Sequence, residues 1–468
     1  MAVMERVGDP LADDIVSLLV GQRPLPSSTH TAHSANQPDA TARLNEATRL
    51  MAGWTHNGTL LSWPAPLPFA VAAPGEEPSV TQVLHRYLQQ AAHLPDWADR
   101  AKVERAENLF MAHGPMSCTL LFCASLPECY MPPHLAGVLH IAGQLETNTE
   151  HRIRQTAAMV FPVMMRGGLM SPGGTGVAQV LKVRLIHATI RHLILHGNPA
   201  QVRGPVLRRQ RGTPAGMHQA MSDHGWDVDV QGVPCNQIEL AYTLLTFSYV
   251  FLNGMRKLGQ GLSEEDEEAY LHAWNVMGHV LGIRREWMAH TMKDAAALFE
   301  RIQARARTVV VTPDVRPGLG RALMNTMANA IHLPVLRHVP VPLTQWLIGR
   351  QTARDIGVDE RVPLLSRLVF RLGLVLVRIV DALVGLISSR FSIVRLLSRT
   401  IGYHMLTRFL LDQTRPLTLP EQVLNPMMQT VEAWSHDPQS SAWWNRLEDR
   451  MTTQGPWRAR PRAQAEKA

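Results

Sequence analysis

The sequence predicts an all-α protein built as one large helical domain. From residue 80 to about residue 306, nearly every segment places apolar residues three and four positions apart, the spacing of one helix face. Alternating runs of Val, Ile and Thr with hairpin turns are lacking, apart from a short candidate strand at residues 308–312. With 46% hydrophobic and 18% charged residues over 468 positions, the chain has globular composition and is long enough to bury a large cofactor.

The individual helices follow from this periodicity. A first pair is expected at residues 80–90 and 97–113, because Pro95 and Gly114 bound segments with apolar residues at helical spacing. Further helices of the same period are expected at residues 135–144, 149–166, 177–196, 236–257 and 264–281.

The N-terminal region, residues 1–60, is expected to be a mobile leader. Residues 22–39 are rich in Pro, Ser, Thr, His and Ala and show no apolar periodicity. The short apolar run at residues 15–20 lies beside Asp9, Asp13 and Asp14. Acidic residues at this place are wrong for a secretory signal. We therefore expect a cytoplasmic protein.

The C-terminal region is expected to hold amphipathic helices over residues 351–435 and a disordered basic tail over residues 454–468. Within it, residues 362–399 alternate apolar stretches with arginines, and no apolar run approaches the ~20 residues that span a membrane. These helices either pack on the core, which the pattern favours, or make a peripheral membrane contact with the arginines outward.

The charge balance and the cysteine spacing argue against a nucleic-acid partner, a disulfide framework and a zinc site. Lys and Arg exceed Asp and Glu by 46 to 39, a modest excess without the basic-aromatic interleaving of nucleic-acid binders, so no nucleic-acid partner is expected. The four cysteines show no CxxC spacing, so neither a disulfide framework nor a zinc site is supported.

Two polar stripes occur on otherwise apolar predicted helices. Arg152 and Thr156 are four residues apart, and Arg184, His187 and Arg191 are three and four apart, so each set shares one helix face. If the helices are neighbours, the stripes could converge on one pocket.

These residue types suit a haem site. A neutral imidazole can bind haem iron and guanidinium groups can pair with propionate carboxylates. These spacings alone are weak, because a lone histidine among 21 is more often structural.

Several longer strings occur together and in a fixed order. They are the Arg152–Thr156 motif, LPECYMPP from Leu126, VRLIHATIRHLI from Val183, GVPCNQIELAYTLLTFSYV from Gly232, WNVMGHVLGI from Trp274 and LIGRQTARDIGV from Leu347. In this combination the chain resembles the latex-clearing-protein and MpaB-type rubber oxygenase family, and the domain so delimited covers residues 80–350.

The resemblance implies a globin-like helical core that binds haem b and uses dioxygen to cleave carbon-carbon double bonds of an isoprenoid or otherwise hydrophobic substrate. It implies that His187 is the proximal iron ligand and that Arg152 and Thr156 are the catalytic polar pair near the haem. Arg184 and Arg191 are then expected to neutralise the propionates.

One position departs from the family. Where latex-clearing proteins carry a lysine just before the threonine, this chain has Gln155. Glu146 and Glu150 are the nearby candidates for the acidic residue proposed as a base in the family, and no register argument assigns that role to either of them. A second hypothesis is therefore kept open, in which the chain is a non-catalytic haem-binding or membrane-peripheral protein. A third is a helical protein without a cofactor.

Overall fold

The computed structural model describes residues 4–20, 40–61, 78–143, 149–196, 226–331, 336–337, 339–359, 393–406, 428–431, 434 and 442–452. Within these ranges all regular elements are helices, so the predicted all-α class is confirmed. The candidate strand at 308–312 is irregular.

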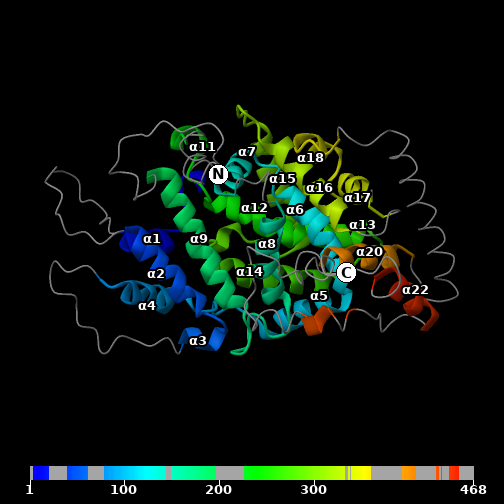
Figure 1. Cartoon of the computed structure of the whole chain (residues 1–468), viewed down its shortest axis with the longest axis horizontal. Coiled ribbons are helices and arrows are strands. Elements are labelled where there is room, and N and C mark those ends of the chain that lie inside the picture. Colours follow the sequence, from blue (N-terminus) through cyan, green and yellow to red (C-terminus); the bar gives the residue numbers. More distant parts are fainter. Residues whose placement is uncertain are drawn as a thin grey trace, which may run out of the picture.

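The helices pack into one bundle, with α1, α2 and α4 at one end and α16, α17 and α20 toward the other (Figure 1). In the first half of the chain they are η1 (Met4–Arg6), α1 (Pro10–Val20), α2 (Ala40–Ala52), α3 (Asn57–Leu61), α4 (Val80–Ala91), α5 (Arg100–Leu120), η2 (Leu121–Ser125), α6 (Leu126–Glu128), α7 (Pro133–Gly143), α8 (Thr149–Met164) and α9 (Gly176–His196). The second half contributes α11 (Val228–Gln231), α12 (Gln237–Phe247), α13 (Tyr249–Lys257), α14 (Glu264–Val280), η4 (Arg285–Trp287), α15 (Met292–Arg307), α16 (Arg316–Ala330), α17 (Pro340–Ile348), α18 (Arg350–Asp355), α20 (Ile393–Leu406) and α22 (Ala442–Thr452).

Helix α5 packs against α14 and α20 and runs on where the sequence predicted a stop. It bends at Gly114, whose φ of 44° suits glycine, and continues through Pro115. By length and composition alone, the continuous helical run Arg100–Glu128 could cross a membrane. Since 78% of its apolar window is buried inside the fold, the run also has the character of a core helix.

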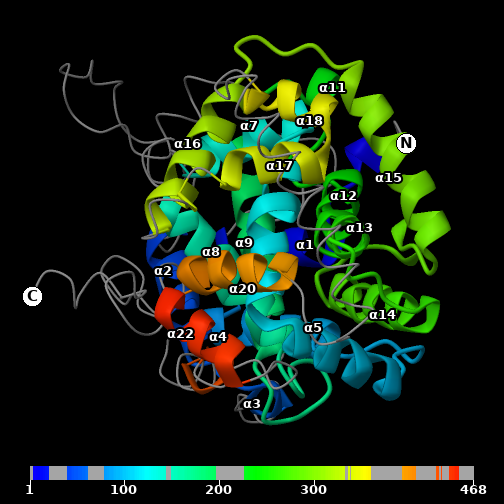
Figure 2. The ribbon, with the colours of Figure 1, turned by 90° about the vertical axis from the view of Figure 1, so that its right-hand side faces the viewer.

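Helix α20 packs across α5, as Figure 2 shows. A Cβ at Gly402 would lie 1.6 Å from the carbonyl oxygen of Pro115, so only glycine permits this approach. Leu396, Ile401 and Met405 of α20 are buried. Residues 396–399 of the arginine-bearing segment therefore follow the core-packing alternative, while residues 362–392 and the tail 454–468 lie outside the described residues.

The expected mobile leader is wrong for the first helices. Helix α1 buries five apolar side chains against α2, α4 and α9, namely Ala12, Ile15, Val16, Leu19 and Val20. Arg43 of α2 donates to the carbonyl oxygens of Leu18 and Leu19 at 3.2 and 2.9 Å, which satisfies acceptors that a helix end leaves open. Residues 22–39, whose composition suggested the leader, lie outside the described residues.

A buried carboxyl group joins four helices of the core. Glu128, at the end of α6, accepts hydrogen bonds from Tyr242 at 3.0 Å, from Thr352 at 3.3 Å, and from Gln303. Burial raises the pKa of Glu128 to about 7, although the hydrogen bonds from Tyr242 and Thr352 work against that rise. The carboxyl group is therefore largely protonated in the folded protein below neutral pH.

Glu128→Gln is expected to change how stability depends on pH. Because the folded-state pKa of Glu128 is raised from 4.5 to about 7, its stabilisation is complete below about pH 4.5 and is lost as pH rises through about 7. Relative to wild type, the variant should have a higher free energy of unfolding above pH 8, by about 3 kcal/mol, and no advantage at pH 4.5. Urea denaturation across this range measures it.

Glu264→Gln, at an exposed position of α14, is the matched control and should leave the pH profile unchanged. Parallel profiles of wild type and Glu128→Gln would contradict the raised pKa.

Candidate functional site

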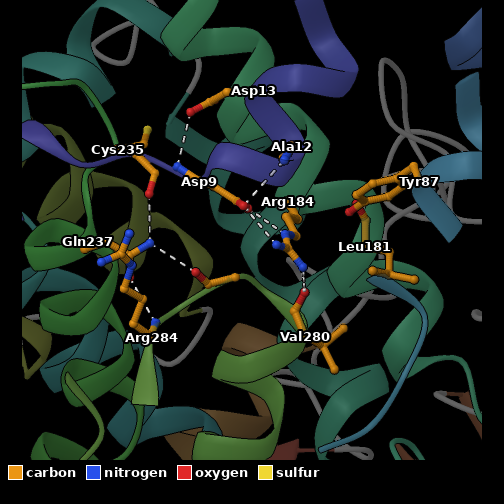
Figure 3. A network of polar contacts seen from close by, with 12 residues as sticks. Asp9, Ala12, Asp13, Tyr87, Leu181, Arg184, Cys235, Gln237, Val280 and Arg284 are labelled. Atoms are coloured by element: carbon orange, nitrogen blue, oxygen red, sulfur yellow. Dashed lines mark hydrogen bonds and ion pairs between the residues drawn. The ribbon is translucent and has the colours of Figure 1, made fainter. Parts of the chain in front are cut away.

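The predicted polar stripes lie on α8 and α9, which are neighbours, but the stripes contact different elements. On α9, Arg184 is 9% exposed and binds Asp9 at the start of α1 through two parallel contacts, Nε to Oδ2 at 2.5 Å and Nη2 to Oδ1 at 2.8 Å. Its Nη1 donates to the carbonyl oxygen of Val280 at 3.2 Å (Figure 3). All three guanidinium nitrogens of Arg184 are thus engaged.

Arg191, one turn beyond His187, contacts a second carboxylate, that of Asp13 within α1, through Nε alone. Its Nε lies 3.1 Å from Oδ1 of Asp13, and its Nη1 donates to the carbonyl oxygen of Cys235 at 3.4 Å. Its Nη2 is buried and finds no hydrogen-bond partner in the described part of the chain. Arg191 therefore keeps one nitrogen for a further acceptor.

Two glycines and one glutamine fit closely around these ion pairs. A Cβ at Gly282, where φ is +91°, would lie 2.4 Å from Oδ2 of Asp9, and a Cβ at Gly8 would lie 2.5 Å from Nε of Arg191. Gln237, the first residue of α12, donates through Nε2 to the carbonyl oxygens of both glycines, at 2.9 and 3.0 Å. The N-terminal helix is thereby fixed to α9, α12 and the end of α14.

His187 lies at the edge of this cluster and is half-buried. Its Nδ1 is buried, and neither ring nitrogen has a hydrogen bond among the described residues. Burial and then the nearby Arg191 guanidinium lower the pKa of His187 to about 4, with Asp9 acting in the opposite direction. The imidazole is therefore neutral at physiological pH and has a nitrogen lone pair available, as an iron ligand requires.

The α8 pair faces the core instead. The Arg152 guanidinium carbon lies 5.0 Å above the Tyr130 ring, and its buried Nη1 has no hydrogen-bond partner among the described residues. Thr156 donates to the carbonyl oxygen of Arg152 at 3.1 Å and lines an apolar cavity with residues of η2, α6, α8 and α12. The cavity is only about 10 Å³, close to the least that holds one water. None of its lining residues comes from α9, so the two stripes do not meet at this cavity.

These observations test whether the predicted residues suit a haem. His187 suits a haem, because its imidazole is neutral and has no hydrogen-bond partner among the described residues. Arg191 offers one donor, whereas Arg184 already has a carboxylate partner in Asp9. The propionate roles of Arg184 and Arg191, and the catalytic roles of Arg152 and Thr156, stay predictions.

A non-haem metal site built on three histidines of α9 gains no support. His192 lies against His196, with ring centroids 4.7 Å apart, rather than beside His187. No group of three or more candidate metal ligands occurs in the part of the chain that the structure describes.

The sequence did not single out Asp9, Asp13, Gln237 or Gly282 as parts of the site. The signal that was available is a pair of carboxylates on one face of a short apolar helix. Two carboxylates four residues apart complement two arginines seven residues apart, but the sequence gives no register between segments so far separated.

Gly282→Ala tests the close packing at the ion pair. The added methyl group would meet the Asp9 carboxylate and force an unfavourable φ, so the free energy of unfolding should fall by about 3 kcal/mol. Gly173→Ala, where a Cβ meets only the Ser171 hydroxyl oxygen at 4.0 Å, is the control and should change little. Equal stabilities of the two variants, measured by urea denaturation, would contradict the packing described.

Comparison with known proteins agrees with the helical architecture. Residues 109–379 match the catalytic-domain model of the ER-bound oxygenase mpaB/B′ and rubber oxygenase family. The chain is 24% identical to the rubber oxygenase of Streptomyces sp. (strain K30) over 294 residues, which are 61% of this chain and 63% of that protein. It also resembles the solved structure of latex clearing protein LCP in the closed state, with a TM-score of 0.57 and 18% identity over 92% of this chain and 90% of the other. The chain therefore belongs to the MpaB and rubber oxygenase catalytic-domain family.

Proposed function

We propose that the chain is a haem-b-dependent oxygenase that acts with dioxygen on a hydrophobic, isoprenoid-like substrate. The observation that carries the proposal is His187, which lies on α9 within the segment that the family model matches. Its imidazole is neutral and has no hydrogen-bond partner in the part of the chain that the structure describes. A bound haem would supply the iron at which dioxygen is activated. The protein's part is to hold and orient that group and to exclude water.

The remaining residues would act around this ligand. The free Nη2 of Arg191 would donate to a propionate carboxylate. Arg152 and Thr156 would shape the opposite side of the pocket and the access of dioxygen. The apolar lining beside Thr156, which includes Phe122, Phe161 and Phe247, suits a hydrocarbon rather than a polar substrate. At its present volume the cavity must widen to admit one.

A second candidate function is non-catalytic haem binding, and Gln155 favours it. This residue replaces the family's lysine, and its side chain is exposed to solvent. The two candidates share haem binding and differ in turnover. Both candidates keep a cytoplasmic location, with peripheral membrane contact as the alternative to core packing for residues 362–392, which lie outside the described residues.

Haem ligation by His187 has a direct spectroscopic test. Wild-type protein from haem-supplied cells should show a Soret band that is lost or shifted in His187→Ala, because the axial ligand is removed. His196→Ala, at an exposed position of the same helix, is the matched control and should keep the wild-type spectrum. A wild-type protein without a Soret band, even after haem addition, would overturn the proposal.

Thr156→Val separates the two candidate functions. The substitution keeps the shape of the side chain and removes its hydroxyl, so haem content should be unchanged while oxygen-dependent cleavage of a polyisoprenoid falls about 100-fold. Product formation measured under air and under nitrogen gives the readout. Absence of product from the haem-loaded wild type would favour the non-catalytic candidate.

A further inference from the structure

Helix α9 carries the predicted iron ligand between two arginines that are tied to the N-terminal helix. At roughly 100° per residue, the side chains of Arg184 and Arg191 leave α9 about 60° and about 40° from that of His187, in the same rotational sense. Both arginines end on carboxylates of α1, Arg184 on Asp9 and Arg191 on Asp13. These two ion pairs thus restrain the rotation of α9 about its axis, and with it the direction in which the His187 side chain leaves the helix.

Two roles for the α1 carboxylates are conceivable once haem is considered. They could stand in for the propionates and be displaced when haem binds, or they could stay in place and hold the arginines. In the first case removal of a carboxylate would strengthen haem binding, and in the second it would weaken haem binding. The sign of one measured change separates the two roles.

The structure favours carboxylates that stay in place. Displacing α1 would expose its five buried apolar side chains, and it would separate Gly8 from the Gln237 amide that also holds Gly282. The Asp9 and Arg184 side chains are only 5% and 10% exposed, so little solvent is at hand to replace the pair. This packing is that of a core helix and not of a lid.

We propose that Asp9 and Asp13 are positioning residues of the haem site: acting through Arg184 and Arg191, they fix the rotation of α9 and so aim His187 at the iron. This inference rests on the proposed function. It makes α1, which precedes the segment matched by the family model, a part of the site. It also assigns Arg184 primarily to Asp9 rather than to a propionate.

The test compares Asp9→Asn and Asp13→Asn with the matched control Asp14→Asn, whose side chain is exposed on the same helix. Haem affinity is measured by titration of the haem-free protein, followed at the Soret band. We expect both variants to bind haem about 10- to 100-fold more weakly, as when an outer partner of a metal ligand is lost, and to show a changed ferric spectrum. Asp14→Asn should match wild type.

Asp13→Asn is the milder of the two changes, because the Asp13 side chain is 36% exposed. This variant carries the test if Asp9→Asn does not fold.

Two further measurements sharpen the result. Haem dimethyl ester lacks the propionate carboxylates, so Arg184→Gln should weaken binding of haem and of the ester equally if Arg184 serves Asp9. Hydrogen exchange of the haem-free protein should show faster exchange of α9 amides around residues 184–191 in Asp9→Asn or Asp13→Asn, but not in Asp14→Asn.

Tighter haem binding by Asp9→Asn or Asp13→Asn, or a loss in Arg184→Gln confined to haem with free propionates, would overturn the positioning role. Unchanged exchange in α9 would also overturn it. If wild-type protein bound no haem, the proposed function would fail on that result, whereas the anchoring of α9 by α1 would still stand or fall on the exchange data.

Discussion

The buried ion pair between Asp9 and Arg184 is the interaction on which the arrangement of this site depends. A guanidinium group that is 90% covered is costly unless a carboxylate compensates it, and removing one partner of such a pair costs about 3–5 kcal/mol. The pair therefore acts mainly by selecting one arrangement of α1 and α9, because an arrangement that separates the two side chains leaves a buried charge without a partner. The remaining guanidinium nitrogen of Arg184 donates to the carbonyl oxygen of Val280, so the same side chain also joins α9 to the end of α14.

The same interaction links the packing of the fold to the chemistry of His187. Asp9 and Asp13 neutralise the two arginines that flank the histidine, while the arginines keep the α9 stripe turned toward α1. Arg191 in turn disfavours a proton on His187. A neutral imidazole with no hydrogen bond among the described residues is the state that the proposed role of axial ligand requires. Elements far from one another in the chain secure this state.

Helical periodicity allowed most helices and the membership of each polar stripe to be predicted, because it determines which residues share a face. It does not determine which element covers that face. Asp9 lies 175 positions from Arg184, and no local pattern relates the two. The leader was misjudged for a related reason: the composition of residues 22–39 was extended to α1, although α1 has an apolar face of its own. Gly114 and Pro115 resemble a helix end but produce a bend, since the burial of the following residues keeps the chain helical.

The crystal structure of the haem-loaded protein would test the account most directly. The account predicts iron bound to a ring nitrogen of His187, with the contacts of Asp9 to Arg184 and of Asp13 to Arg191 intact. Iron held by another residue, or α1 released from α9 with both arginines on the propionates, would contradict it.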